Sequence, residues 1–233
     1  MKNPLLLLAA ISFFLLSTSC SPKRYITQDY HKHAKSHRVI AVLPYANYYT
    51  GRIPKELSAD DLIALQEEES ILFQRSLYFQ LLEESRDHEK NDINVSIEDI
   101  NITNSKIEKA GFAIQDTWTM DPTELAAILD VDAVVKVDLH KDYFLTNEES
   151  AIVNVAATVL DVFGNNRIPG VNSRRLGRTS EMYVNASLID ADAGVSLWAY
   201  NKKYDTDWQC ESDEAIASIN HKISKRFPYR RNL

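Results

Sequence analysis

The sequence predicts an α/β (α+β) fold, a single layered domain in which helices flank a mixed sheet. Short β-branched apolar runs alternate with helical patterns in the first part of the chain, and two alternating segments joined by a turn follow near its end. The 233 residues are enough for one domain with its own core, and no internal repeat is visible. We expect a single α/β interaction domain over residues 38–233, preceded by a signal and a tether.

Residues 1–19 have the pattern of a bacterial lipoprotein signal peptide. Lys2 gives a positive start, residues 5–16 form an apolar run, and three small residues precede Cys20. The run is too short to span a bilayer as a helix. Ser17 departs from the leucine that is usual at its position. We expect cleavage before Cys20 and lipidation of its sulfur, which would give a stable membrane anchor.

Residues 20–37 are expected to be the lipidated cysteine followed by a flexible tether. They are polar, contain Pro22 and show no apolar periodicity. His31, His33 and His37 have a spacing that could collect a metal ion, but no carboxylate or thiolate supports them. We therefore favour a chance cluster in a flexible arm, and we predict no metal site and no cofactor.

The domain is expected to begin with a buried strand over residues 38–44, which Pro44 ends. Residues 45–51 are expected to form a loop that exposes tyrosines. Because tyrosine is favoured at interfaces, these are candidate partner contacts, with packing over a strand end as the equal alternative: Tyr45, Tyr48 and Tyr49. Ser58 and Asp61 have the spacing of a capping box and open a helix to about Ser85, whose second half is the buried half.

Two shorter helices and a strand are expected next. One helix runs to about Lys109 and ends at Gly111 as a left-handed cap, and its N-cap candidates are Asn101, Thr103 and Asn104. The second begins with Asp121 as cap and Pro122 at the first helical position, and continues through residue 129. Residues 132–139 then form a strand that changes from buried to alternating.

The last third contains a hairpin and a final helix. Residues 182–188 and 195–199 alternate apolar and polar side chains around a turn, which predicts an antiparallel pair. A helix over residues 212–227 has acids in its first turn and bases in its last. Between these parts, residues 150–163 are assigned to a helix, although their valine content would also suit a strand. Residues 164–178 form a long loop, a type that is commonly functional.

The formal net charge of −7 disfavours a global attraction to nucleic acid or to anionic lipid. Removing residues 1–19 takes away Lys2 and no acid, which leaves −8. Two basic groups stand out locally, and either could contact a lipid headgroup or an acidic partner, although a solvated face is the favoured interpretation. The first lies in the long loop and the second at the C-terminus: Arg167, Arg174, Arg175 and Arg178; Lys222, Lys225, Arg226, Arg230 and Arg231.

No catalytic motif is present in the sequence. Neither a Gly-x-Ser-x-Gly nor a His-Glu-x-x-His pattern occurs, and there is no phosphate-binding glycine loop. Cys210 has an acidic neighbourhood that disfavours a thiolate, so we interpret it as a packing residue. His140, near Asp138 and Asp142, is the best candidate for proton transfer, but a histidine at a sheet edge is the preferred alternative. We expect a protein that is not an enzyme, with a hydrolase as the alternative.

Three segments together resemble a family of periplasmic lipoprotein domains that includes the curli secretion lipoprotein, the penicillin-binding-protein activator lipoproteins and the TolB N-terminal domain. The segments are residues 39–45, 123–135 and 188–198. Asp130 and Val137 depart from the family, because relatives commonly have glycine there. The resemblance implies a three-layer α/β domain used for assembly and protein contact.

The resemblance and the anchor together set the functional expectations. We expect a membrane-anchored accessory in envelope assembly or secretion, or alternatively a regulator of a peptidoglycan synthase. Envelope proteins are the expected partners, with self-association as in some relatives and without nucleic acid. Ser21 after the lipidated cysteine favours delivery to the outer membrane, and the basic residues that follow favour its periplasmic face.

Overall fold

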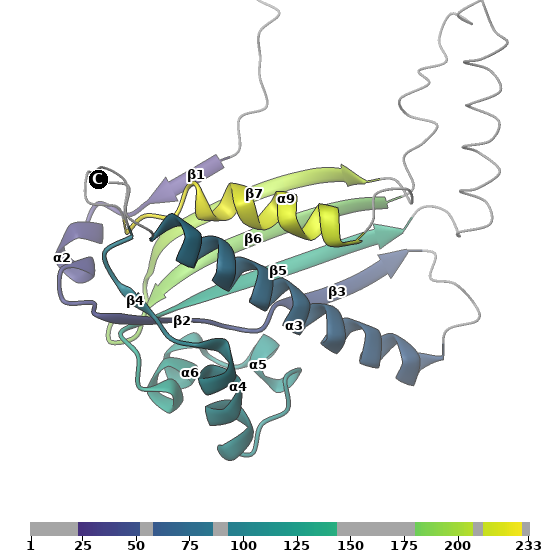
Figure 1. Ribbon diagram of the computed structural model, residues 1–233, viewed down its shortest axis with the longest axis horizontal. Helices are drawn as coiled ribbons and strands as arrows, with labels where there is room; N and C mark the ends of the chain where they lie inside the picture. The colour runs from purple at the N-terminus through teal and green to yellow at the C-terminus, as the bar shows by residue number, and fades with distance from the viewer. Residues whose placement is uncertain (1–22, 52–57, 86–92, 144–179, 207–211, 230–233) are drawn as a thin grey trace, which may run out of the picture.

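A computed structural model describes residues 23–51, 58–85, 93–143, 180–206 and 212–229, and within them seven strands form one mixed sheet (Figure 1). The sheet order is β1-β7-β6-β5-β2-β4, with β3 paired to β5. The strands are β1 (Lys23–Ile26), β2 (Val39–Val42), β3 (Ala46–Gly51), β4 (Ser96–Ile97), β5 (Ala133–Tyr143), β6 (Ser180–Asp190) and β7 (Ser196–Thr206). The helices are α2 (Tyr30–Ala34), α3 (Ala59–Glu84), α4 (Ile100–Lys109), α5 (Asp116–Thr119), α6 (Pro122–Leu129) and α9 (Ser212–Ser224).

Strand β5 organises the sheet. It pairs antiparallel with β6 along its whole length, and its other edge is shared by two parallel strands, β2 and then β3. Between these two strands, Leu43 still donates its backbone N–H to Val135. Pro44 has no N–H to donate, so the ladder is interrupted there before β3 resumes it opposite Asp138.

Helices pack on both faces of this sheet, which confirms the predicted α/β (α+β) fold with a mixed sheet flanked by helices (Figure 1). The larger core lies between the sheet and helices α3 and α9, where Phe73 and Leu77 meet Val135 and Val137. The smaller core lies on the opposite face, where Leu125 and Leu129 of α6 pack against strand residues such as Val134. The alternation of strand side chains between the two cores follows from the period of two in a β-strand.

The predicted helix starts are largely confirmed. Ser58 and Asp61 form the expected capping box at α3, and Asp121 caps α6 with Pro122 in its first turn. The N-cap of α4 is Asp99 rather than any of the three predicted residues, because its carboxylate accepts from the N–H of Asn101 and starts the helix earlier. Gly111 has a φ of 89°, as a left-handed cap requires.

Helix α6 ends at a residue in the left-handed conformation. Asp130 has a φ of 53° and is the only described residue other than glycine with a positive φ. This is the position at which the resembling family commonly has glycine. The left-handed cap is therefore kept without the residue that adopts it most easily.

The prediction of a flexible tether is wrong for the residues that the structure describes before residue 38. Strand β1 pairs antiparallel with β7, and Tyr30 on α2 is only 4% exposed in the larger core. A four-residue strand and a five-residue helix are too short to show apolar periodicity, so their sequence looks like a linker. The folded part begins by Lys23, not at residue 38.

The hairpin of β6 and β7 is confirmed and is longer than predicted, with a register shift between Leu188 and Ile189. Helix α9 ends at Ser224, three residues before the predicted end. The predicted helix over residues 150–163, the loop over 164–178 and Cys210 lie outside the described residues.

Candidate interaction surface

The three candidate tyrosines do not form one exposed loop. Tyr45 is fully buried, stacks on Phe73 and donates its hydroxyl hydrogen to Asn220 of α9. Residues 46–51 are strand β3, so Tyr48 and Tyr49 point to opposite faces of the sheet. The predicted loop over residues 45–51 is wrong, because β3 begins two residues after Pro44 and pairs with β5.

Tyr49 belongs to a buried polar cluster under α3. Its hydroxyl donates to Glu69 of α3, and Lys141 of β5 forms an ion pair with the same carboxylate at 2.5 Å. The Lys141 ammonium also lies 5.0 Å from the centre of the Tyr49 ring. Both charged side chains are about nine-tenths buried, so this cluster fixes β3 and β5 to α3 and offers little to a partner.

Tyr48 lies on the other face, in a row of side chains that crosses four neighbouring strands. The register places Tyr48 opposite His140, His140 opposite Tyr183, and Tyr183 opposite Lys203. We call these four residues the open-face row. Within it, the rings of Tyr48 and His140 stack at 4.8 Å, and the Lys203 ammonium lies 5.1 Å from the Tyr183 ring.

The open-face row is accessible to a partner. Tyr183 is 43% exposed, His140 and Lys203 are exposed, and Tyr48 is half-buried. Glu181 fixes two members, because it pairs with Lys203 at 2.6 Å and accepts from the Tyr183 hydroxyl at 2.7 Å. Along the same face, Tyr25 of β1 is 56% exposed. The result is an accessible surface that is rich in aromatic side chains and also carries the charges of Glu181 and Lys203.

Trp118 of α5 closes one end of the row. Its ring meets Tyr48 edge-on at 6.0 Å, and Lys136 donates to its backbone carbonyl at 2.8 Å. Its buried indole N–H has no hydrogen-bond partner among the described residues. Burial raises the pKa of Asp138, with Lys136 and His140 opposing it, and burial followed by the Asp138 charge raises the pKa of Tyr48. The end near Trp118 is therefore partly dehydrated.

His140 does not occupy a sheet edge as expected, because β5 is an interior strand with β6 on one side and β2 and β3 on the other. Its interaction with Tyr48 is a ring stack. One signal in the sequence could have indicated the row. Residues 136–142 and 181–187 alternate between buried and more exposed side chains, and the more exposed positions include the rings of His140 and Tyr183. Which of these residues are neighbours depends on strand register, which local pattern does not contain.

A second polar site, which is not predicted from the sequence, connects residues near the start of the described part of the chain with residues near its end. His37 is buried, and its Nε2 donates to the Asp190 carboxylate at 2.8 Å, which leaves Nδ1 to accept from the Tyr229 hydroxyl. Burial raises the pKa of Tyr229 above its usual range, so the phenol keeps the proton that it donates. His33 lies 3.6 Å from the same carboxylate, whereas His31 stacks edge-on against Tyr30. The three histidines thus do not converge.

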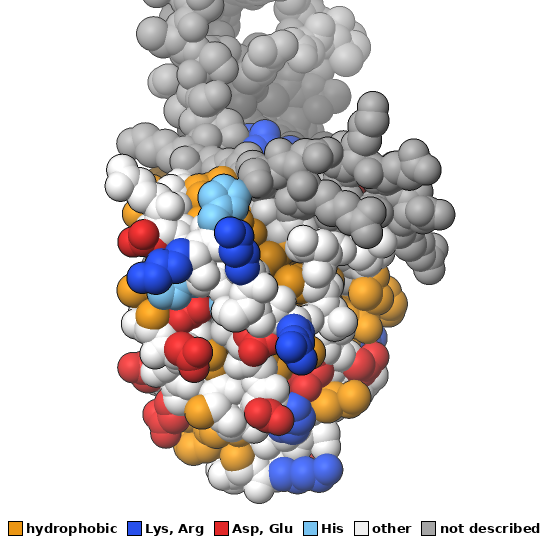
Figure 2. All heavy atoms as spheres, turned by 90° about the vertical axis from the view of Figure 1, so that its left-hand side faces the viewer, with side chains coloured by type: hydrophobic (Ala, Val, Ile, Leu, Met, Phe, Trp, Pro, Cys, Tyr) orange, Lys and Arg blue, Asp and Glu red, His pale blue; other side chains and the backbone are white. Residues whose placement is uncertain are grey.

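Within the described residues, no cluster of three histidine, cysteine or acidic side chains suits a metal ion. The described helices also include none that is long and apolar enough to cross a bilayer. Figure 2 looks onto the end of the domain that carries α2 and shows acidic, basic and hydrophobic side chains interspersed there. Cys20 and the four loop arginines, Arg167, Arg174, Arg175 and Arg178, lie outside the described residues.

No protein-family model matches the sequence, and no curated protein matches it. Several solved structures of bacterial proteins are similar in fold to this chain, and one of them is named a lipoprotein. PelC from Paraburkholderia phytofirmans, described as a dodecamer, is 12% identical over 88% of this chain and 96% of its own, with a TM-score of 0.42.

Two further solved structures complete this comparison. Lipoprotein GNA1162 from Neisseria meningitidis is 10% identical over 81% of this chain and 96% of its own, with a TM-score of 0.40. The C-terminal domain of LpoB from Salmonella enterica is 9% identical over 76% of this chain and 93% of its own, with a TM-score of 0.34. These likenesses are of fold alone, because every identity is 12% or less.

Proposed function

We propose that this chain is a bacterial envelope lipoprotein that acts through protein contacts and not by catalysis. A lipid on Cys20 holds it on the periplasmic face of the outer membrane, where it is an accessory in envelope assembly or secretion. The observation that carries the proposal is the open-face row, in which partly or fully exposed aromatic side chains from several strands lie together on the sheet face opposite α3 and α9. Exposed aromatic side chains close to charged residues are a composition that protein interfaces favour.

The contrast between the two sheet faces supports a contact role. On the α3 face, the hydroxyls of Tyr45 and Tyr49 donate hydrogen bonds to residues inside the protein. On the open face, Tyr183 leaves much of its ring in solvent while Glu181 and Lys203 hold it in place. A ring that is already fixed loses little conformational entropy when a partner covers it, which favours affinity.

Metabolic labelling tests the anchor. Cells that express the chain are grown with a palmitate analogue, and the purified protein is examined for label. The parent and a Cys210→Ser control are expected to carry the lipid, and Cys20→Ser is expected to lose it. Label that survives Cys20→Ser, or that is absent from the parent, overturns the anchor. Sedimentation of the two membranes and protease added to intact cells then test the location.

Crosslinking in intact cells, followed by identification of the captured protein, tests the role. Recovery of an export-channel or assembly component supports the role of an accessory in envelope assembly or secretion. Recovery of a peptidoglycan synthase supports instead the role of a regulator of that enzyme. A ladder of the chain's own multiples supports self-association. If the purified protein hydrolyses envelope polymers and His140→Ala abolishes this activity, both binding roles fall. Charge removal at Arg167, Arg174, Arg175 and Arg178 tests whether the loop is a second contact region.

A further inference from the structure

A cluster of three cations lies where strand β7 meets helix α9. Lys202 comes from the strand, Lys222 lies on α9, and Arg226 lies in the turn that follows the helix. All three gather around two tyrosines of β7. The ammonium groups of Lys202 and Lys222 lie 5.1 and 5.0 Å from the Tyr204 ring, and the Arg226 guanidinium lies 5.6 Å from the Tyr200 ring.

No acidic side chain among the described residues forms an ion pair with any of these three cations. The neighbouring Lys203 and Lys225 do have acidic partners, Glu181 at 2.6 Å and Glu84 at 2.7 Å. Burial first, and then the charges of Lys202 and Arg226, lower the pKa of Lys222. Within the described part of the chain, three like charges are thus grouped without an acidic ion-pair partner, although the net charge of the protein is −7. Such an arrangement is suited to an anion supplied from outside.

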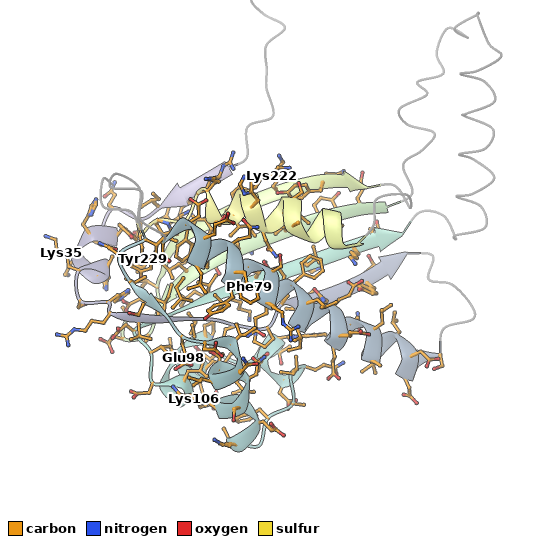
Figure 3. The ribbon with its side chains drawn as sticks, in the orientation of Figure 1. Lys35, Phe79, Glu98, Lys106, Lys222 and Tyr229 are labelled. Carbon is orange, nitrogen blue, oxygen red and sulfur yellow. The ribbon has the colours of Figure 1, made fainter. Side chains whose placement is uncertain are left out.

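The cluster lies beside the first described strand of the chain. Strand β1 pairs with β7 so that Arg24 is opposite Tyr200 and Lys23 opposite Asn201, and Lys202 follows directly. Figure 3 shows Lys222 on the same side of the domain as β1. Cys20 precedes Lys23 by only three residues. Even a fully extended chain spans at most about 11 Å over that interval.

A lipid on Cys20 would thus hold this edge of the sheet within about 11 Å of the headgroups. At that distance, charges at the protein surface lie within about one Debye length of an anionic membrane. The other faces of an acidic protein are repelled by such a surface, so the cluster would also set the orientation of the domain.

We propose that Lys202, Lys222 and Arg226 bind the phosphates of anionic phospholipid headgroups in the membrane that anchors Cys20, so that the domain lies against the bilayer by its β1–β7 edge. The proposal rests on the lipid anchor of the proposed function. In this arrangement the domain does not move on a long tether but lies with its β1–β7 edge against the bilayer. The open-face row then stays accessible to a partner.

Vesicle flotation tests the proposal without the lipid. The chain from residue 20 to 233 with Cys20→Ser retains every described residue and is mixed with vesicles of phosphatidylcholine, with or without phosphatidylglycerol. It is expected to float with the anionic vesicles only and to detach as salt rises. The triple variant Lys202→Gln, Lys222→Gln and Arg226→Gln is expected to bind roughly a hundredfold more weakly, since each cation near a membrane contributes about fivefold.

A matched control removes the same charge elsewhere. Lys32, Lys35 and Lys109 are exposed, so their triple change to Gln is expected to leave binding within about twofold. Equal losses in the two triple variants, or equal binding to neutral and anionic vesicles, would overturn the proposal. Circular dichroism of each variant verifies that it is folded. Because Cys20 carries no lipid in this experiment, a failure of the cluster is distinct from a failure of the anchor in palmitate labelling.

Discussion

Tyr48 of β3 stacks on His140 of β5, with ring centres 4.8 Å apart and ring planes 22° apart. The two residues lie on parallel strands at directly opposed register positions. This stack starts the row that continues through Tyr183 to Lys203. Two strands that are distant in sequence thus place their rings on one sheet face, where together they form a candidate contact surface.

The tyrosines on the two sides of the sheet are expected to differ in their effect on stability. Tyr45→Ala should lower the free energy of unfolding by about 3–5 kcal/mol, because a fully buried ring is replaced by a cavity. Tyr183→Ala should cost less than about 1 kcal/mol, because Tyr183 is already 43% exposed and lies outside the core. Urea denaturation measures both changes. Similar losses would show that the two tyrosines are buried alike and would remove Tyr183 from the contact surface.

Removing one partner of the buried ion pair of Lys141 and Glu69 is expected to lower the free energy of unfolding more than replacing both partners with apolar residues. Lys141→Met alone should destabilise the protein by about 3–5 kcal/mol, because it leaves the Glu69 carboxylate buried without its cation. Adding Glu69→Leu should recover most of this loss. A double-mutant cycle by chemical denaturation measures the coupling. Additive effects of the two changes would mean that the pair is not coupled.

The left-handed cap at Asp130 predicts a stabilising substitution. Asp130→Gly should raise the free energy of unfolding by about 0.5–1 kcal/mol, because glycine adopts a φ of 53° without steric cost. Asp130→Ala should not stabilise, since alanine keeps the Cβ that causes the strain. Thermal melts of the three proteins measure this order. A lower melting temperature for the glycine variant than for the parent would contradict the assignment of strain.

The buried carboxyl of Asp138 predicts a pH dependence of stability. Burial raises its pKa above the unfolded value of 3.8, so between these two values the folded protein holds a proton that the unfolded chain has lost. Stability from this group therefore falls as the pH rises through that window, and it stays lower above it. Asp138→Asn should flatten this part of the curve of stability against pH. The gain in stability of the variant over the parent should therefore be larger at pH 7 than at pH 4. Unfolding curves across pH measure the slope, and an unchanged slope in the variant would refute the assignment.

Elements that depend on neighbouring residues were predictable from the sequence. The capping box of Ser58 and Asp61 and the proline start of α6 involve residues within three positions of each other. The alternation in β6 and β7 is equally local. By contrast, β1 and α2 are stabilised by contacts with residues far along the chain, such as the pairing of β1 with β7 and the ring contact of Tyr30 with Tyr229. Their own sequence is too short and too polar to indicate that these contacts exist.

The candidate surface was predictable in part. Tyr48 is one of the proposed contact residues and does lie on the open face, whereas Tyr45 is core and Tyr49 completes an internal ion pair. The three residues differ because β3 is a strand, and a strand sends neighbouring side chains to opposite faces. The partners of Tyr48, namely His140 and Tyr183, come from two other strands, so only the strand register brings them together.

The measurement that tests the account most directly is residue-specific photocrosslinking in intact cells. A photoreactive amino acid replaces Tyr183 on the open face or, as a matched control, Phe79 on α3, which is 57% exposed and lies over the other face of the sheet (Figure 3). The account predicts that position 183 captures a specific envelope protein and that position 79 does not. Capture of a partner from position 79 but none from position 183 would contradict the claim that the open sheet face is the contact surface.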